Sequence, residues 1–222
     1  MIKKLKFLNY FFLFILFSTF FPNFNKTNKS IFFSIKNIEI KDIYFLSSKE
    51  IESSLSNIKN KNLLFVSNDY IQSKLVEYDF ISSFQVKKVF PNTLVIKIKE
   101  KKPVAIHFDG KKNFYISENG DFINFIALEK YKNLPFVFGK NIDFGIFFQN
   151  MKKINFPLSE VKSYHYFDIG RWDITFKNDK ILKLPKQNYE EILEKFILIM
   201  QDKNFEKYKI FDYRIKNQLI LN

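Results

Sequence analysis

The sequence predicts an α+β protein with an N-terminal transmembrane helix, a β-α-α-β-β module and then a larger mixed β-sheet domain with two helices. Three observations support this fold class. An almost wholly apolar run follows three lysines at the N-terminus. Residues 35–101 then show strand, helix, helix, strand and strand periodicity in turn. After residue 102, short alternating runs separated by turn signals dominate. The sequence there lacks the glycine-rich βα crossover that is typical of a doubly wound sheet.

Composition excludes several function classes. The 222 residues contain no cysteine, so neither a disulfide framework nor thiolate chemistry is available. The formal net charge is +13, yet arginine occurs only at Arg171 and Arg214 among 36 basic residues. Proteins that bind nucleic acid typically use the forked donors of arginine for phosphates and bases. We therefore expect no nucleic-acid partner, and we attribute the charge to a lysine-rich composition.

The N-terminus predicts a membrane anchor. Lys3, Lys4 and Lys6 precede an apolar segment of about 17 residues, which is at the short end of a membrane span. The positive-inside rule keeps these lysines in the cytoplasm. We expect a cytoplasmic tail at residues 1–6, a transmembrane anchor at 7–24 and a linker at 25–34. A cleaved signal peptide is the alternative, but the sequence around Ser18 and Thr19 is a poor cleavage site.

Residues 35–101 predict a small module with helices on one face of a three-stranded sheet. Ile38 and Ile40 alternate with charged residues, as in a half-buried strand. Ser47 and Glu50 have the spacing of a capping box, and Ser67, Asn68 or Asp69 can cap a second helix. The expected inner faces of the two helices comprise Ile51, Leu55 and Ile58, and then Ile71, Leu75 and Val76.

A hairpin closes the module. Phe84 and Val86 alternate on one strand, Pro91-Asn92 forms the turn, and the return strand carries its apolar residues at 94, 96 and 98. Glu100 falls in phase with these apolar residues, so we expect it where the core of the sheet ends. Pro103 would interrupt the ladder. The domain boundary is therefore predicted near residue 101, between domains 35–101 and 102–222.

The second domain reads as about seven strands and two helices. Hairpin turns are expected at Asp109-Gly110 and Asn119-Gly120, and a loop at Leu134-Pro135 and Gly139. Strand-like runs occupy residues 161–167, 171–176 and 180–184, and residues 208–221 form a strand-like tail. One helix is expected from about residue 143 to 153, although Gly145 weakens it. The other begins at a capping box of Asn188 and Glu191, with an apolar face of Ile192, Phe196, Ile199 and Met200.

The sequence shows no catalytic constellation. Its two histidines, His107 and His165, lie on predicted strands among aromatic residues, where packing is the usual role. His165 and Asp168 are three apart, which places them on opposite faces of a strand. Motifs of hydrolases, metalloproteases and P-loop proteins are absent from the sequence. We expect a protein that is not an enzyme and that binds no metal or other cofactor.

Several motifs taken together resemble the FtsQ/DivIB family of bacterial cell-division proteins. Residues 86–94 resemble the family's Val-x-Arg-x-x-Pro-x-Thr-Leu, and residues 100–105 its Glu-Arg-x-Pro-Val-Ala. Residues 118–122 are similar to its Asp-x-x-Gly-x-Phe hairpin, and residues 134–139 to its Leu-Pro-x-x-x-Gly. Arg171-Trp172 and Asp212-Tyr213-Arg214 fit its Arg-Arg-Trp and Asp-Leu-Arg positions. Gly170 and Ile215 depart from the family pattern, which has arginine at the first position and in some relatives tyrosine at the second.

The resemblance implies a role as well as a fold. It implies a POTRA domain at 35–101, an FtsQ-type β domain at 102–222, and a non-catalytic bitopic scaffold of the divisome. Such a protein sits in the inner membrane at the division septum with its C-terminus in the periplasm. It links early to late assembly by binding other division proteins. The implied partners are bitopic proteins of the FtsB/FtsL type, added as a strand at the C-terminal sheet edge, and further divisome proteins at the POTRA domain.

The partner site implied by the resemblance lies at and just after the Asp-Leu-Arg motif. Carried over to this chain, the site comprises Arg171, Trp172, Asp212, Arg214, Ile215 and Asn217. From the residues alone, Asp212 and Arg214 read equally well as an ordinary surface ion pair on an edge strand. Two alternative functions stay open. One is a POTRA-containing protein of outer-membrane protein export, and the other is a secreted protein, either a binding protein or a hydrolase.

Overall fold

The computed structural model describes residues 10–17, 32–140 and 143–222. Residues 10–17 are helical. No helix within the described ranges is long and apolar enough to cross a membrane. The predicted anchor at 7–24, with the tail at 1–6 and the linker at 25–34, lies largely outside these ranges.

The first domain has the predicted β-α-α-β-β order. Its sheet runs β1-β3-β2, with β1 parallel and β2 antiparallel to the central β3. The elements are β1 (Asn37–Lys41), α2 (Ser48–Ser54), α3 (Asn68–Leu75), β2 (Ile81–Val89) and β3 (Thr93–Glu100). Alternation along β3 turns Leu94, Ile96 and Ile98 toward the two helices, and all three are buried.

Side-chain caps begin both helices of the first domain, as the sequence predicts. Ser47 accepts a hydrogen bond from the backbone N–H of Glu50, and Ser67 accepts one from that of Asp69. The expected inner faces hold with one exception. Val76 is 71% exposed, because α3 ends at Leu75 and Val76 is only its C-terminal cap.

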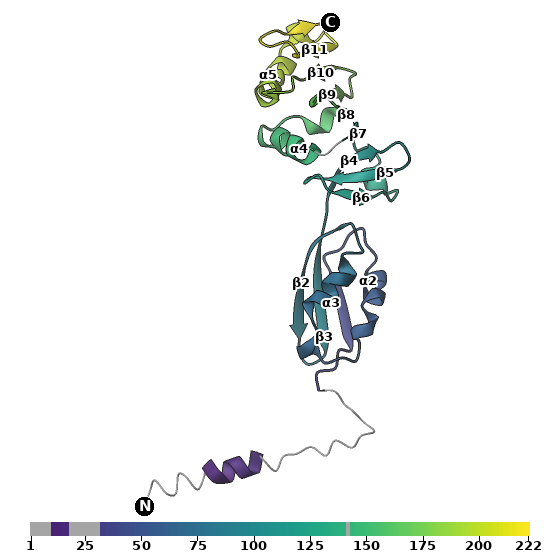
Figure 1. Cartoon of the computed structure of the whole chain (residues 1–222), viewed down its shortest axis with the longest axis vertical. Helices are drawn as coiled ribbons and strands as arrows, with labels where there is room; N and C mark the ends of the chain where they lie inside the picture. The colour runs from purple at the N-terminus through teal and green to yellow at the C-terminus, as the bar shows by residue number, and fades with distance from the viewer. Residues whose placement is uncertain (1–9, 18–31, 141–142) are drawn as a thin grey trace, which may run out of the picture.

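The second domain contains one nine-stranded mixed sheet in the order β12-β11-β10-β9-β8-β7-β4-β5-β6. Figure 1 shows this domain following the first along the long axis of the view, with α4 and α5 along one side of the strands. The strands are β4 (Pro103–Phe108), β5 (Asn113–Ser117), β6 (Phe122–Asn124), β7 (Phe136–Phe138), β8 (Val161–Phe167), β9 (Arg171–Phe176), β10 (Ile181–Lys183), β11 (Ile210–Asp212) and β12 (Ile220–Leu221). The helices are α4 (Phe144–Lys153) and α5 (Tyr189–Gln201).

The main core lies between this sheet and the two helices. Trp172 of β9 stacks on Phe147 of α4 with ring centroids 4.6 Å apart, and Phe211 of β11 meets Phe196 of α5 at 5.2 Å. Because successive strand residues point to opposite faces, the neighbours of these aromatics face away from the helices. One face of the sheet is therefore hydrophobic and covered by the helices, and the other carries polar residues.

Three sequence-based expectations for this domain are wrong in detail. Residues 136–138 form strand β7, although we expected a loop there. Asn188 has a left-handed backbone (φ 56°) and its side chain makes no capping hydrogen bond, so the capping box is absent. The tail at 208–221 is not one strand, because β11 stops at Asp212 and the chain returns as β12.

Candidate partner-binding site at the sheet edge

Strand β12 forms the C-terminal edge of the large sheet. It pairs antiparallel with β11, and within the described chain no strand lies on its other side. Asn222 and Ile210 exchange backbone hydrogen bonds at 3.1 and 2.9 Å. Hydrogen-bonded and non-bonded pairs alternate along an antiparallel ladder, so Leu221, opposite Phe211, turns its N–H and C=O outward. An edge with outward donors and acceptors can receive another strand.

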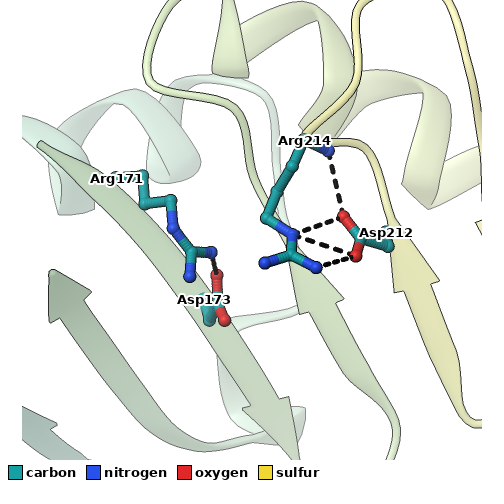
Figure 2. Close-up of polar contacts among 4 residues, drawn as sticks. All are labelled: Arg171, Asp173, Asp212 and Arg214. Atoms are coloured by element: carbon teal, nitrogen blue, oxygen red, sulfur yellow. Dashed lines mark hydrogen bonds and ion pairs between the residues drawn. The ribbon is translucent and has the colours of Figure 1, made fainter. Parts of the chain in front are cut away.

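Next to this edge, the polar face of the sheet carries a row of alternating charges. Asp173 of β9, Lys183 of β10 and Asp212 of β11 lie opposite one another across three strands. Both aspartates are buried. Their charge is compensated by the neighbouring Lys183 and by two arginines. Figure 2 shows the two arginines beside the aspartates.

Arg214 is bound to Asp212 by a fork of hydrogen bonds. Its Nε donates to both carboxylate oxygens at 2.8 and 2.9 Å, and its Nη2 donates to Oδ2 at 2.5 Å. These bonds hold the pKa of Asp212 below its usual value, although partial burial opposes the shift. The side chain of Arg214 remains 44% exposed. Among the residues that the structure describes, no hydrogen bond reaches its Nη1, so the arginine is fixed and still has donors for a partner.

Arg171 is held differently. Its Nη1 donates to Oδ1 of Asp173 at 2.6 Å, and its guanidinium lies over the ring of Phe167 at 4.1 Å. Both members of the pair are largely buried. Burial raises the pKa of Asp173, and Arg171, Lys183 and Arg214 oppose that rise. Arg171 therefore balances the negative charge of Asp173 and exposes little of its own surface.

Trp172 points the other way from Arg171, into the helix-covered core. It is 5% exposed and packs on Phe147 and on Tyr166, whose ring centroid is 4.8 Å away. Its position on the strand explains this, because residues 171 and 173 take the polar face and residue 172 must take the other. Trp172 fixes β9 against α4 and does not reach the surface where Arg214 lies.

Ile215 and Asn217 lie in the loop between β11 and β12, not on a strand. Asn217 has a left-handed backbone (φ 60°), which turns the chain back toward β12. Ile215 is exposed. This loop and the start of α5 border a groove of about 600 Å³. Its lining includes Pro185, Gln187, Ile192, Lys195, Tyr213, Arg214, Ile215, Asn217 and Leu219.

The structure brings some of the predicted site residues together and separates others. Arg214, Ile215 and Asn217 line the groove, whereas Arg171 and Asp212 lie on the polar face of the sheet and outside the lining of the groove. Sequence reasoning missed Lys183 and Asp173, which alternation with Arg171 could have indicated. It also missed the true edge at Ile220–Leu221, which the turn-forming Lys216-Asn217 before an apolar run could have signalled.

The two histidines make structural contacts. Nδ1 of His107 lies 3.1 Å from the carbonyl of Val137, and Nε2 of His165 lies 3.1 Å from the hydroxyl of Ser163. Burial lowers the pKa of His165, whereas its cross-strand neighbour Asp173 raises it. No cluster of three or more His, Cys, Asp or Glu side chains suited to a metal occurs in the described ranges.

Comparison with known proteins gives matches to both domains. The FtsQ-type POTRA domain matches residues 33–101, and the C-terminal region of cell division protein FtsQ/DivIB matches residues 105–214. Cell division protein FtsQ of Rhizobium radiobacter is 25% identical over 123 residues, which cover 54% of this chain and 59% of that protein. Those of Rickettsia conorii and Rickettsia bellii are 28% and 30% identical over 144 residues, covering 63% of this chain and 53% of each relative.

The chain thus matches between about half and three fifths of the length of these relatives. The extracytoplasmic domain of DivIB from Geobacillus stearothermophilus is also similar, at 16% identity and a TM-score of 0.32, over 49% of this chain and 98% of that one. The two domain matches follow one another along the chain and together cover most of it. The chain therefore belongs to the FtsQ/DivIB family of bacterial cell division proteins.

Proposed function

We propose that this chain is a non-catalytic bitopic scaffold of the divisome, which binds other division proteins outside the cytoplasm and links early to late assembly at the septum. Family membership supports the role in cell division. In the proposal, residues 7–24 anchor the chain in the inner membrane, with the N-terminus in the cytoplasm and the C-terminus in the periplasm. The observation that carries the scaffold role is the open edge of β12 beside the exposed guanidinium of Arg214.

The proposed partner at this edge is a bitopic protein of the FtsB/FtsL type that adds one strand. Leu221 offers one outward N–H and one outward C=O, and main-chain bonds of this kind give strand addition its affinity. β12 has only two residues, so the ladder alone is short. Side chains next to the edge must supply the rest of the binding energy.

Arg214 and the groove are suited to that task. We infer that a carboxylate of the partner reaches Arg214, whose orientation Asp212 already fixes, so little side-chain entropy is lost on binding. Ile215 and the apolar wall of the groove would receive an apolar side chain, and Asn217 shapes the loop. In this proposal Arg171, Asp173 and Trp172 contribute indirectly, by holding β9 in place.

The POTRA domain is the proposed site for other divisome proteins, through its second helix and last strand. The sheet order limits how the strand can act. β3 is the central strand and both of its edges are paired, so it can offer only side chains such as Lys97 and Lys99 on the exposed face. The backbone edges of this sheet belong to β1 and β2.

Proline at Leu221 tests strand addition directly. Leu221→Pro removes the outward N–H without removing a hydrogen bond between β11 and β12. We expect its affinity for a purified FtsB/FtsL-type partner to fall by at least about tenfold, while Leu221→Ala keeps the backbone donor and most of the binding. Equal binding by Leu221→Pro and Leu221→Ala would refute strand addition at this edge. Unchanged thermal unfolding must accompany the Leu221→Pro result, because a variant that loses its fold does not test the edge.

Two truncations separate the edge from the loop. Removal of residues 220–222 deletes β12 but leaves the loop that carries Arg214, and removal of residues 212–222 deletes both. We expect both to lose the partner while the POTRA domain stays folded. Asn217→Pro should also weaken capture, because proline cannot adopt the left-handed backbone of Asn217. Full capture by either truncated chain would exclude the C-terminal edge as the site.

Localisation tests the role in division independently. A fluorescent fusion of the full chain is expected to form a band at mid-cell in dividing cells. A uniform envelope signal would contradict the septal role even if the purified chain bound a partner. The Leu221→Pro variant should still reach mid-cell if recruitment depends on the POTRA domain, and should then fail to retain the partner there.

A further inference from the structure

The end of the POTRA domain where the chain enters exposes a cluster of large apolar side chains. We call the cluster the entry patch; it comprises Phe32, Phe33, Leu64, Phe65 and Phe90. All five are exposed, and Phe65 is 83% exposed. Five large exposed apolar side chains in one place are unusual for a surface that faces only water.

Several contacts show that these residues form one surface. Phe33 and Phe90 meet edge to face with ring centroids 5.1 Å apart. The N–H of Leu63 donates to the carbonyl of Phe33 at 2.8 Å, and the side chain of Asn62 donates to the carbonyl of Phe32 at 2.8 Å. The entry segment, the short turn at 63–65 and the β2–β3 turn therefore lie side by side.

Basic residues surround the entry patch. Nζ of Lys88 donates to the carbonyl of Leu64 at 2.8 Å, which places this ammonium group beside the turn. Lys36 and Lys61 are also exposed and lie close by along the backbone. The N–H of Lys36 donates to the carbonyl of Asn92, and the N–H of Ile35 donates to the carbonyl of Lys61. The nearby carboxylate of Glu52 is paired with Lys59 at 2.8 Å, and Asp69 follows at the start of α3. The net charge of this end is positive.

The position of the entry patch along the chain limits its distance from the predicted anchor. Seven residues, 25–31, lie between position 24, where the predicted anchor ends, and Phe32, so the connection has eight Cα–Cα steps. A fully extended chain of that length spans at most about 28 Å. Figure 1 shows the chain entering the domain at the end opposite the large sheet, so the entry patch is on the anchor side of the domain.

We propose that the entry patch rests on the lipid surface, with its aromatic side chains in the headgroup region and its lysines among anionic headgroups. Aromatic and apolar side chains with a rim of lysine are the composition of surfaces that bind at the membrane interface. Attraction to anionic lipid acts only within roughly a Debye length of about 8 Å, so the short connection to the anchor is what makes the contact effective. The proposal rests on the anchor at 7–24 that is part of the proposed function.

A single-cysteine label on the full chain tests the contact, because the natural sequence contains no cysteine. Asn68→Cys places an environment-sensitive fluorophore three residues from Phe65, and Tyr44→Cys places the same probe at another exposed site beside Glu100, at the other end of the domain. The full chain is reconstituted in phosphatidylcholine vesicles with and without phosphatidylglycerol, including a lipid with a nitroxide near its headgroup. We expect several-fold stronger quenching at position 68 than at 44, and more quenching with phosphatidylglycerol.

A matched variant shows whether the entry patch causes the quenching. Phe65→Ser with Phe90→Ser in the Asn68→Cys chain should reduce quenching to the level of position 44, while the intrinsic fluorescence of Trp172 stays unchanged. Equal quenching at 68 and 44, or quenching that survives both serines, would overturn the proposal. Flotation after carbonate extraction separates the two hypotheses. A chain that floats but shows no quenching at 68 refutes only the lipid contact, and a chain that does not float refutes the anchor and the contact with it.

Discussion

At the residue scale, two Arg–Asp pairs of the same composition have different roles. Arg171 and Asp173 are both largely buried, and their main effect is to balance each other's charge on the polar face of the sheet. Asp212 is buried but Arg214 is not, so this pair orients a donor toward solvent. The difference follows from position, because residue 171 begins an inner strand and residue 214 has already left β11 near the edge.

Asp212→Asn should separate orientation from charge. The depressed pKa of Asp212 means that its carboxylate stabilises the folded state above the ordinary carboxyl value of 3.8 and that this stabilisation is lost as pH falls through the folded pKa. We expect the variant to lower the free energy of unfolding by about 1–2 kcal/mol at pH 7, because hydrogen bonds to a charged partner are lost. The loss should shrink in acid. Urea unfolding at pH 7 and near pH 3 measures both values.

Asp179→Asn is the matched control for this prediction. Asp179 also pairs with a cation, Lys162 at 2.9 Å, but it is exposed, and asparagine tolerates its left-handed backbone. We expect little change in stability. The forked hydrogen bonds to Arg214 are not the source of the stabilisation if Asp179→Asn and Asp212→Asn lower the free energy of unfolding equally. The same holds if the loss in Asp212→Asn persists in acid.

At the scale of elements, α4 contains a glycine in its first turn. Glycine has low helix propensity, so Gly145 weakens the helix that the sequence predicts here. The structure shows why it is there. A Cβ at residue 145 would lie 2.4 Å from the carbonyl oxygen of Asn119 and 2.8 Å from the backbone nitrogen of Gly120. The first turn of α4 therefore packs directly on the β5–β6 hairpin turn.

Gly145→Ala should consequently destabilise the protein, although helix propensity alone predicts about 1 kcal/mol of stabilisation. We expect a loss of about 1–3 kcal/mol, the usual cost of overpacking against backbone atoms that cannot move aside. Gly110→Ala is the comparison, since it meets nothing within 4 Å and carries only the strain of its positive φ. Chemical denaturation of the two variants measures whether each substitution raises or lowers the free energy of unfolding. A stabilised Gly145→Ala would show that the hairpin turn shifts to make room.

The elements that the sequence predicts well are those with a local physical signal. The caps at Ser47 and Ser67 and the hairpin turns at Asp109-Gly110 and Asn119-Gly120 depend on neighbours in sequence, and the structure has them. β7 could not be predicted, because its three residues pair in parallel with β4 and β8, both distant in sequence.

In the candidate site, too, local features can be predicted from the sequence and long-range pairing cannot. Asp212 and Arg214 are two residues apart, and their pairing can be expected from sequence. The row through Lys183 depends on the register of three strands, which no local pattern specifies. The side of β9 that Trp172 takes also depends on the placement of α4, since the indole needs Phe147 as its partner. Motif similarity marks the segments at 171–172 and 212–214 as candidates, but only the fold decides which of their side chains reach the surface.

At the scale of the whole molecule, the junction between the domains is a packed interface. Phe80 of the POTRA domain joins Ile106, Tyr115, Ile123 and Tyr131 of the second domain in one buried cluster. Phe45 completes it, with ring centroids 5.1 Å from Tyr131 and 6.2 Å from Phe80. A polar contact also crosses the junction, because the side-chain amide of Asn124 in the second domain donates to the carboxylate of Asp79 in the POTRA domain.

Glu100 is the residue that connects β3 to this interface. Its carboxylate accepts hydrogen bonds from the N–H groups of Tyr44, Phe45 and Leu46 at 3.0 to 3.2 Å. Phe45 and Leu46 are the residues of that loop that pack into the cluster. Glu100 therefore lies where the sheet's apolar core ends, as its phase predicted, and it holds the loop that carries Phe45 against the second domain.

Glu100→Ala should loosen the junction without unfolding either domain. Three backbone N–H groups lose their acceptor, the loop at 44–46 gains freedom, and Phe45 loses its fixed position. Spin labels at Lys87→Cys and Lys203→Cys, one in each domain, report the distance between the domains in the otherwise cysteine-free chain. We expect one narrow distance distribution in the natural sequence and a clearly broader one in Glu100→Ala. Lys99→Ala, the neighbouring exposed residue, should leave the distribution unchanged.

The outcome bears on how the proposed scaffold would work. If the junction is rigid, the edge at β12 is held at a fixed distance from the POTRA domain, and a partner strand can be added only by a protein whose own segment reaches that position. If Glu100→Ala keeps a narrow distance distribution, the aromatic cluster alone fixes the junction, and Glu100 only accepts the hydrogen bonds of the loop at 44–46. Broadening together with weaker capture of the FtsB/FtsL-type partner would show that domain orientation contributes to binding. Broadening with unchanged capture would show that the edge acts by itself, independently of the POTRA domain below it.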